Sequence, residues 1–310
     1  MFKDCVSLVN VPNLSATNIH TGSCSNMFKG CTSLVNAPQL PATTLESYCY
    51  ESMFEGCTSL RNTSQLPATT LASYCYKNMF KDCTSLVNAP QLPATTLTGY
   101  CYYGMLSGTN LLPDLTNINF EDEQILQSCG LCGLFAGTKI TDGDLKHILP
   151  TNPSTGNPYL PSGMYSNMFE GCTLLTTAPE LPATELSNNC YKSMFAGCTS
   201  LVNAPELPAT TLYSQCYSSM FEGCTLLTTA PELPATELPS GNARSGCYSS
   251  MFKGCSNLNY IKLLLTATES NNNNFKNWVD GVSSTGTFVK VKDVVLPDGT
   301  IPEGWTVEEV

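Results

Sequence analysis

Apolar residues return along the chain at a fixed spacing. A Met-Phe pair recurs every 26 residues in two blocks, at Met1, Met27, Met53 and Met79 and then at Met168, Met194 and Met220. Met105-Leu106 takes the place of a fifth pair, and Met251 follows Met220 after a slightly longer interval. Repeat periods of about 20 to 50 residues are typical of solenoids, propellers and stacked arrays. The chain is therefore predicted to be a repeat protein.

Each repeat divides into two halves. In CTSLVNAPQLPATTLTGYCYYGM, which begins at Cys83, the first half carries Leu, Ala and Leu at three-residue intervals and contains Pro. Because Pro removes a donor from a strand ladder, this half predicts a very short strand. In the second half of a unit, residues such as Cys75, Met79 and Cys83 fall at i, i+4 and i+8, which predicts a short helix with one apolar stripe.

This unit resembles the BspA-like (Treponema-type) leucine-rich repeat, in which a Leu-rich strand and a Leu-Pro step precede a helical half with an apolar-Phe pair before a Cys. About ten tandem matches cover nearly the whole chain, and the longer units are similar to surface proteins of gut Bacteroidetes. The resemblance implies an α/β repeat solenoid. This would be a leucine-rich-repeat right-handed superhelix of ~26-residue units, each with a short parallel strand and a short helix. It implies a cell-surface or adhesive role without a defined ligand.

The regular period is interrupted within the predicted solenoid. The interval between Met105 and Met168 exceeds two regular periods and holds one degenerate unit, in which Thr138 replaces the usual Cys. Two units, each longer than the regular repeat, would fill this gap. A solenoid is therefore expected over residues 1–262, with irregular units over 105–167.

The last segment, residues 263–310, is predicted to be a small C-terminal β cap. The stretch TGTFVKVKDVVL alternates as a strand does, and the Pro-Asp-Gly that follows supplies a turn, so a β hairpin is expected. Trp278 and Trp305, the two tryptophans of the chain, are expected to cover the last apolar layer.

Fourteen of the 17 cysteines fall in two columns, four residues before or after the Met position. A helix would separate the two columns by roughly 12 Å, whereas a disulfide needs Cα atoms within about 7 Å. Buried thiols that pack as small apolar groups are therefore expected. The pair Cys129 and Cys132 stands apart, either as a metal or redox pair or as a degenerate repeat position.

Two aromatic columns accompany the cysteines. The Phe of each Met-Phe pair is predicted to form a core spine. The Tyr column after the first Cys is expected to pack amphipathically, with carbohydrate stacking as the alternative. This column consists of Tyr50, Tyr76, Tyr102, Tyr191, Tyr217 and Tyr248.

Composition removes several classes of function. The chain carries a net charge of -11 with 14 Lys plus Arg, so nucleic acid is not expected as a partner. No apolar stretch approaches the ~20 residues that span a bilayer, so no membrane insertion is expected. His20 and His147 are the only imidazole groups, and no nucleophile, phosphate-loop or metal-hydrolase motif accompanies them, so no catalytic residue, metal or cofactor is predicted.

The strand side offers the one candidate binding stripe. Carboxylates follow Ala-Pro in the second block, and Gln residues occupy the same place in the first. Such a row suits a cation or a basic partner, or else is a solvated row copied by duplication of the unit. The stripe comprises Glu180, Glu206, Glu232, Glu185, Glu237, Gln39, Gln65 and Gln91.

The favoured function is a non-catalytic binding or adhesion module, extracellular or at the cell surface, that recognises protein or glycan through the solenoid face. The alternative is a structural or assembly module of an appendage or phage-type fibre; an enzyme is a third hypothesis. Because MFKDCVSLVN at Met1 matches the middle of a unit, missing sequence or a stacking partner is expected at that end.

Overall fold

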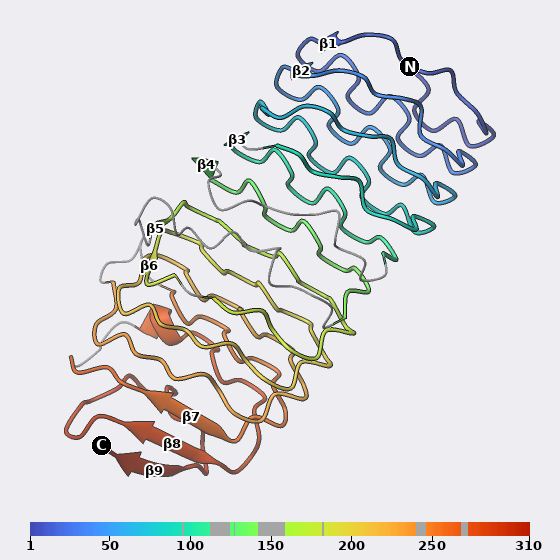
Figure 1. Ribbon diagram of the computed structural model, residues 1–310. Coiled ribbons are helices and arrows are strands. Elements are labelled where there is room, and N and C mark those ends of the chain that lie inside the picture. Colours follow the sequence, from blue (N-terminus) through green and yellow to red (C-terminus); the bar gives the residue numbers. More distant parts are fainter. Residues whose placement is uncertain are drawn as a thin grey trace. The chain divides into compact units, whose positions relative to one another are not determined.

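The computed structural model describes residues 1–94, 96–111, 125–126, 128–141, 159–181, 183–239, 246–267 and 272–310. The chain forms two compact units, Met1–Thr155 and Gly156–Val310. Figure 1 shows successive coils of the chain lying side by side within each unit. The predicted boundary at residue 262 lies within a strand of the second unit, β7 (Tyr260–Leu263).

The repeat period reappears as the register between coils. In the first unit β1 (Asn18–Ile19) pairs in parallel with β2 (Thr44–Leu45), and β3 (Thr96–Leu97) pairs with β4 (Ile125–Leu126). In the second unit β5 (Tyr159–Leu160) pairs with β6 (Glu185–Leu186). Asn18 faces Thr44, one regular period further along the chain, whereas Thr96 faces Ile125, slightly more than one period on. One repeat is therefore one coil, stacked in parallel on the next.

The predicted fold class, an α/β leucine-rich-repeat superhelix with a short helix in each unit, is wrong, because no α-helix forms in the described residues and their strands are few and short. A series of tight turns occupies the expected helical half of each coil. The N–H of Met27 bonds back to the Cys24 carbonyl at 3.2 Å, and that of Cys31 to Phe28 at 3.1 Å. The N–H of Phe28 instead reaches Met53 in the next coil at 2.9 Å. In an α-helix every such bond would run to residue i−4 of the same segment.

The turns repeat every four residues. Gly22, Asn26 and Gly30 all have φ between 55° and 72°, in the left-handed region, and the same places are left-handed in the following coils. Over nine residues a period of four cannot be told from the helical period of 3.6, which is why Cys75, Met79 and Cys83 suggested a helix. We call this half of each coil the turn segment.

The core of each unit is built from columns of identical side chains. Phe28 stacks on Phe54 with 5.6 Å between ring centroids, and Phe195 on Phe221 with 5.8 Å. The column that contains Tyr50 and Tyr76 is also buried and stacked, at 5.9 Å. The Phe spine is therefore confirmed, and the Tyr column belongs to the core rather than to a carbohydrate site.

The C-terminal segment contains a further turn segment and a parallel sheet. After the 3₁₀ turn η2 (Asn272–Phe275), Asn277 and Gly281 again have φ of 56° and 75°. Strands β7, β8 (Thr287–Lys290) and β9 (Thr306–Glu309) are parallel in that order, so the expected β8–β9 hairpin is not formed.

Both tryptophans are buried in this C-terminal segment, as predicted. Trp278 takes the place of the repeat Met; it is fully buried against Phe252 and Phe275, and its ring N–H donates to the Thr300 carbonyl at 2.9 Å. Trp305 is 7% exposed.

Candidate functional site

The cysteine columns are packing groups. All 17 cysteines lie within the described residues and carry thiols rather than disulfides. The second column also hydrogen-bonds across coils: Cys57 Sγ donates to the Phe28 carbonyl and Cys83 Sγ to the Phe54 carbonyl, each at 3.1 Å. Burial raises the pKa of Cys57 to about 12. The expectation of buried thiols is therefore confirmed except at Cys5, which is exposed, and Cys57 lacks the thiolate character that a reactive cysteine needs.

Threonine shows what this column requires. Thr109 and Thr138 occupy the Cys position in two coils and are buried. Their hydroxyls donate to the Leu106 and Phe135 carbonyls of their own coil, at 2.8 and 2.7 Å. The position therefore takes a small side chain that satisfies a carbonyl at the end of the turn segment.

The predicted acidic stripe lies on the surface of the second unit. Glu180, Glu206 and Glu232 are exposed and occupy equivalent places, as the parallel register between Thr177 and Asn203 requires. Glu185 and Glu237 are exposed too. In the first unit Gln39, Gln65 and Gln91 are exposed at the same repeat position. The structure thus brings the three carboxylates into one row.

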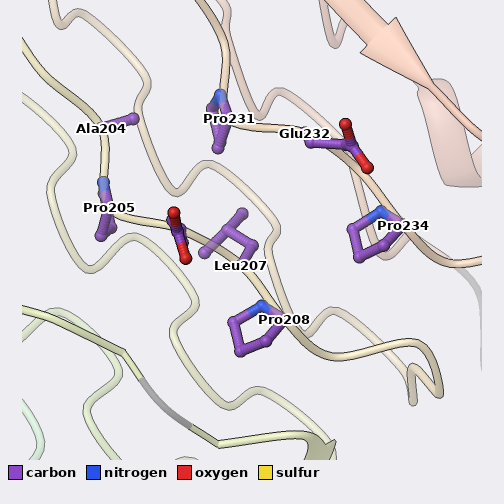
Figure 2. A pocket seen from close by; sticks show the side chains of 8 residues that line it. Ala204, Pro205, Leu207, Pro208, Pro231, Glu232 and Pro234 are labelled. Atoms are coloured by element: carbon purple, nitrogen blue, oxygen red, sulfur yellow. The ribbon is translucent and has the colours of Figure 1, made fainter.

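A shallow depression of about 480 Å³ lies between two coils of this row. Figure 2 shows Pro205 and Pro208 on one coil and Pro231 and Pro234 on the next, with Glu232 at the side. A salt bridge of 2.7 Å between Lys262 Nζ and Glu232 offsets one of the charges. The row is therefore less acidic than the sequence pattern suggests, and it carries no group of His, Cys, Asp or Glu able to hold a metal ion among the residues described.

A second surface, absent from the sequence predictions, is a column of half-exposed tyrosines on the first unit. The rings of Tyr48 and Tyr74 stack at 4.7 Å with 5° between planes, and those of Tyr74 and Tyr100 at 4.9 Å with 2°. We call Tyr48, Tyr74 and Tyr100 the tyrosine ladder. Tyr103 leans on Tyr100 at 6.0 Å, and the Lys77 ammonium lies 5.5 Å from the centre of the Tyr74 ring.

The backbone holds the ladder residues in a conformation that bulky side chains avoid. Their φ angles are 61°, 62° and 60°, because they occupy a left-handed position of the turn segment. Left-handed geometry destabilises a residue other than Gly by about 1–2 kcal/mol. A stacked aromatic pair stabilises by about 0.5–1.5 kcal/mol, so stacking within the ladder offsets much of this cost. In the second unit the same position carries Gly163, Asn189, Gln215 and Gly246, so these described residues form no aromatic ladder.

Cys129 ends the ladder at the next coil, also with a left-handed φ of 54°. A hydrogen bond with the Cys132 thiol, aided by one from the Tyr100 hydroxyl, lowers the pKa of Cys129 to about 7 against the opposing effect of burial. The charge of Cys129 in turn raises the pKa of Tyr100 to about 12. Cys129 is partly exposed, unlike the buried columns.

We expect native protein at about pH 8 to be alkylated rapidly at Cys129, because most of this thiol is then ionised. Exposed Cys5 is the other accessible site, while the buried columns should stay unmodified. Peptide mass spectrometry after brief iodoacetamide treatment measures this, and Cys129→Ser is the control. The rate at Cys129 should fall as the pH drops below about 7. In denaturant all 17 thiols should react; a count of 15 or fewer would contradict the thiol state.

At its other end the ladder stops at Gly22, where three polar residues meet. The Thr21 N–H and hydroxyl both donate to Glu46 Oε2 at 2.8 Å, and His20 Nδ1 lies 3.1 Å from Glu46 Oε1. These hydrogen bonds lower the pKa of Glu46 to about 2, and the bond from the Thr21 N–H has the largest effect. Glu46 is therefore a carboxylate at any physiological pH. His147 lies outside the described residues.

Comparison of the chain with protein-family models, curated proteins and solved structures finds no match. The resemblance to BspA-like repeats therefore stays a prediction. The described part of the chain contains no helix long and apolar enough to cross a membrane.

Proposed function

We propose that the chain is a non-catalytic binding module, located outside the cell or at its surface, that recognises a protein or glycan through the surface of its stacked coils. The observation that carries the proposal is the tyrosine ladder. Tyr48 is 40% exposed although its neighbours in the turn segment, Cys49 and Tyr50, are buried. A row of rigid aromatic rings with polar hydroxyls offers a large contact area at a small entropic cost, which is the property that makes tyrosine frequent in binding surfaces.

The binding surface can be identified by comparing two sets of variants on one array. The array carries glycans, mucins and extracellular proteins, and binding of the intact chain is measured by fluorescence. Replacing Tyr48, Tyr74 and Tyr100 by Ala should reduce the apparent affinity for any bound ligand at least tenfold. Reversing Glu180, Glu206 and Glu232 to Lys tests the acidic stripe as the competing surface.

Each result decides between the surfaces. Loss of binding in the tyrosine variant alone supports the ladder. Loss in the lysine variant alone assigns binding to the acidic stripe and contradicts the ladder. A wild-type chain that binds nothing on the array contradicts the proposed function. Thermal unfolding of each variant, with a melting temperature close to wild type, shows that lost binding is not lost folding.

A further inference from the structure

Cys129 and Cys132 lie outside the two cysteine columns of the repeat. In their coil the first column position is held by Gly130, whose carbonyl accepts the Tyr102 N–H at 3.1 Å, as the carbonyl of Cys101 accepts an N–H from the coil before it. A threonine holds the second column position of the same coil. The pair is therefore not a degenerate form of the repeat cysteines, and its presence needs another explanation.

A single tight turn brings the two thiols together. The Cys132 N–H bonds to the Cys129 carbonyl at 3.4 Å, which closes a turn of four residues. The Cα atoms at the two ends of such a turn lie within about 7 Å of each other, and a disulfide requires about 4.4–6.8 Å. The side chains of the two cysteines are already hydrogen-bonded to each other. A disulfide between them can therefore form without separating the stacked coils.

The two cysteines differ in their access to solvent. Cys129 is partly exposed, whereas Cys132 is 2% exposed. Hydrogen bonds with Cys132 and then with Tyr100 lower the pKa of Cys129 to about 7. Thiol–disulfide exchange needs an accessible thiolate that attacks and a second thiol within reach that resolves the mixed disulfide. Cys129 is suited to the first role and Cys132 to the second.

The column cysteines lack this combination. Cys75 and Cys83 are fully buried, and burial raises the pKa of each thiol well above its ordinary value. A zinc site, which needs about four ligands, does not explain the pair either, because the described residues contain no group of three or more His, Cys, Asp or Glu side chains placed to hold a metal ion. Exchange with a disulfide needs only the two thiols that the turn provides.

We propose that Cys129 and Cys132 form a thiol–disulfide exchange site that low-molecular-weight disulfides oxidise reversibly. The Cys129 thiolate attacks one sulfur of the small disulfide, whose S–S bond breaks and releases one small thiolate, while Cys129 becomes joined to the other half. Cys132 then gives its proton to water and attacks Cys129 Sγ, which closes the protein disulfide and releases the second small thiolate. Two electrons pass from the protein to the small disulfide, and the released thiolates take up the two protons that the protein has lost.

The test uses the intact chain, reduced with dithiothreitol and then freed of it, so that all 17 cysteines start as thiols. The probe is oxidised glutathione at about pH 8, and samples quenched with acid over time are mapped by peptide mass spectrometry. A transient glutathione adduct at Cys129 should give way to a disulfide between Cys129 and Cys132, which dithiothreitol should reverse. This disulfide should form at least tenfold faster than any modification of the column thiols, such as Cys75 and Cys83.

Two serine variants separate the roles of the two thiols. Cys132→Ser should keep the glutathione adduct at Cys129, because no second thiol is left to displace it. Cys129→Ser should leave Cys132 unmodified, because Cys132 is buried. Melting temperatures close to wild type show that the variants are folded, and the wild-type time course decides the question without them.

Three results would overturn the exchange site. The wild-type chain could retain the adduct at Cys129 as Cys132→Ser does, or both thiols could stay reduced. The column thiols could also react as fast as the pair, which would show that the reaction follows unfolding. The inference goes beyond the proposed binding function and does not depend on it, since the array and the thiol map are separate measurements.

Discussion

Replacement of Phe195 by Ala should lower the free energy of unfolding by about 3–5 kcal/mol, the usual cost of removing a buried aromatic ring. Phe195 is fully buried and stacks between Phe169 and Phe221, with 5.8 Å between ring centroids on both sides. The ring is held by the two neighbouring coils, so its loss leaves a cavity that no side chain of its own coil can fill. Chemical denaturation followed by fluorescence or circular dichroism measures the change.

The control is Leu226→Ala, because Leu226 is 47% exposed and should change stability by less than about 0.5 kcal/mol. The double variant of Phe195 and Phe221 should cost less than the sum of the single variants, since the two rings share a contact. A loss of less than about 1.5 kcal/mol for Phe195→Ala would contradict a spine in which every ring supports the next.

The period of the fold could be predicted from the sequence, because identical residues at regular intervals must occupy equivalent places in stacked coils. The conformation of the Cys-Met-Cys segment could not be predicted from its apolar positions alone. A helix and a four-residue turn series both place Cys75, Met79 and Cys83 on one side. The residues between them carried the missing information. Asn and Asp, as at Asn78, tolerate left-handed geometry, and Gly30 favours it. The glycine before the last Cys of most units, such as Gly30 and Gly56, was evidence against a helix there.

Some features of the candidate site could likewise be predicted from the sequence, and others could not. The acidic row was predictable because it follows directly from the repeat. Its partner Lys262 was not, since it comes from β7, beyond the regular repeat, and reaches Glu232 across a coil spacing of 30 residues. The tyrosine ladder could not be predicted, because a second tyrosine lies two residues away in the same segment. In Tyr-Cys-Tyr at residues 48–50, the second tyrosine is buried and the first is exposed, and the sequence does not distinguish them without the turn geometry.

The thiol columns illustrate why a regular row of cysteines is not by itself evidence of chemistry. A cysteine at a fixed place in each coil has the regularity of a metal or disulfide array, but stacking also requires that regularity. Each coil leaves a carbonyl at the end of its turn segment, and the next coil supplies a small side chain with a donor. Cys224 Sγ meets the Phe195 carbonyl at 3.1 Å in this way. Only Cys129, in the ladder column, has the partial exposure and lowered pKa of a reactive thiol.

Gly223→Ala should destabilise the protein by about 1–2 kcal/mol, because Gly223 has a φ of 74° and an L-residue is strained there. The sign of this change in stability distinguishes a four-residue turn series from a helix. In a helix the same substitution would stabilise by about 0.8–1 kcal/mol, since Ala is the better helix former. Space is not the cause, because an added Cβ would lie 3.8 Å from Gly197, at ordinary contact distance.

The matched control is Gly223→Asn, because Asn adopts left-handed geometry more readily than Ala although its side chain is larger. Its cost should therefore be smaller than that of Gly223→Ala, measured by denaturant unfolding under the same conditions. A steric effect would give the opposite order, and a helix would give stabilisation by Ala. Either result would contradict the four-residue turn series. The order Gly, then Asn, then Ala in stability would show that the backbone conformation of the turn segment, rather than helix propensity, selects the residue after Met-Phe-Glu.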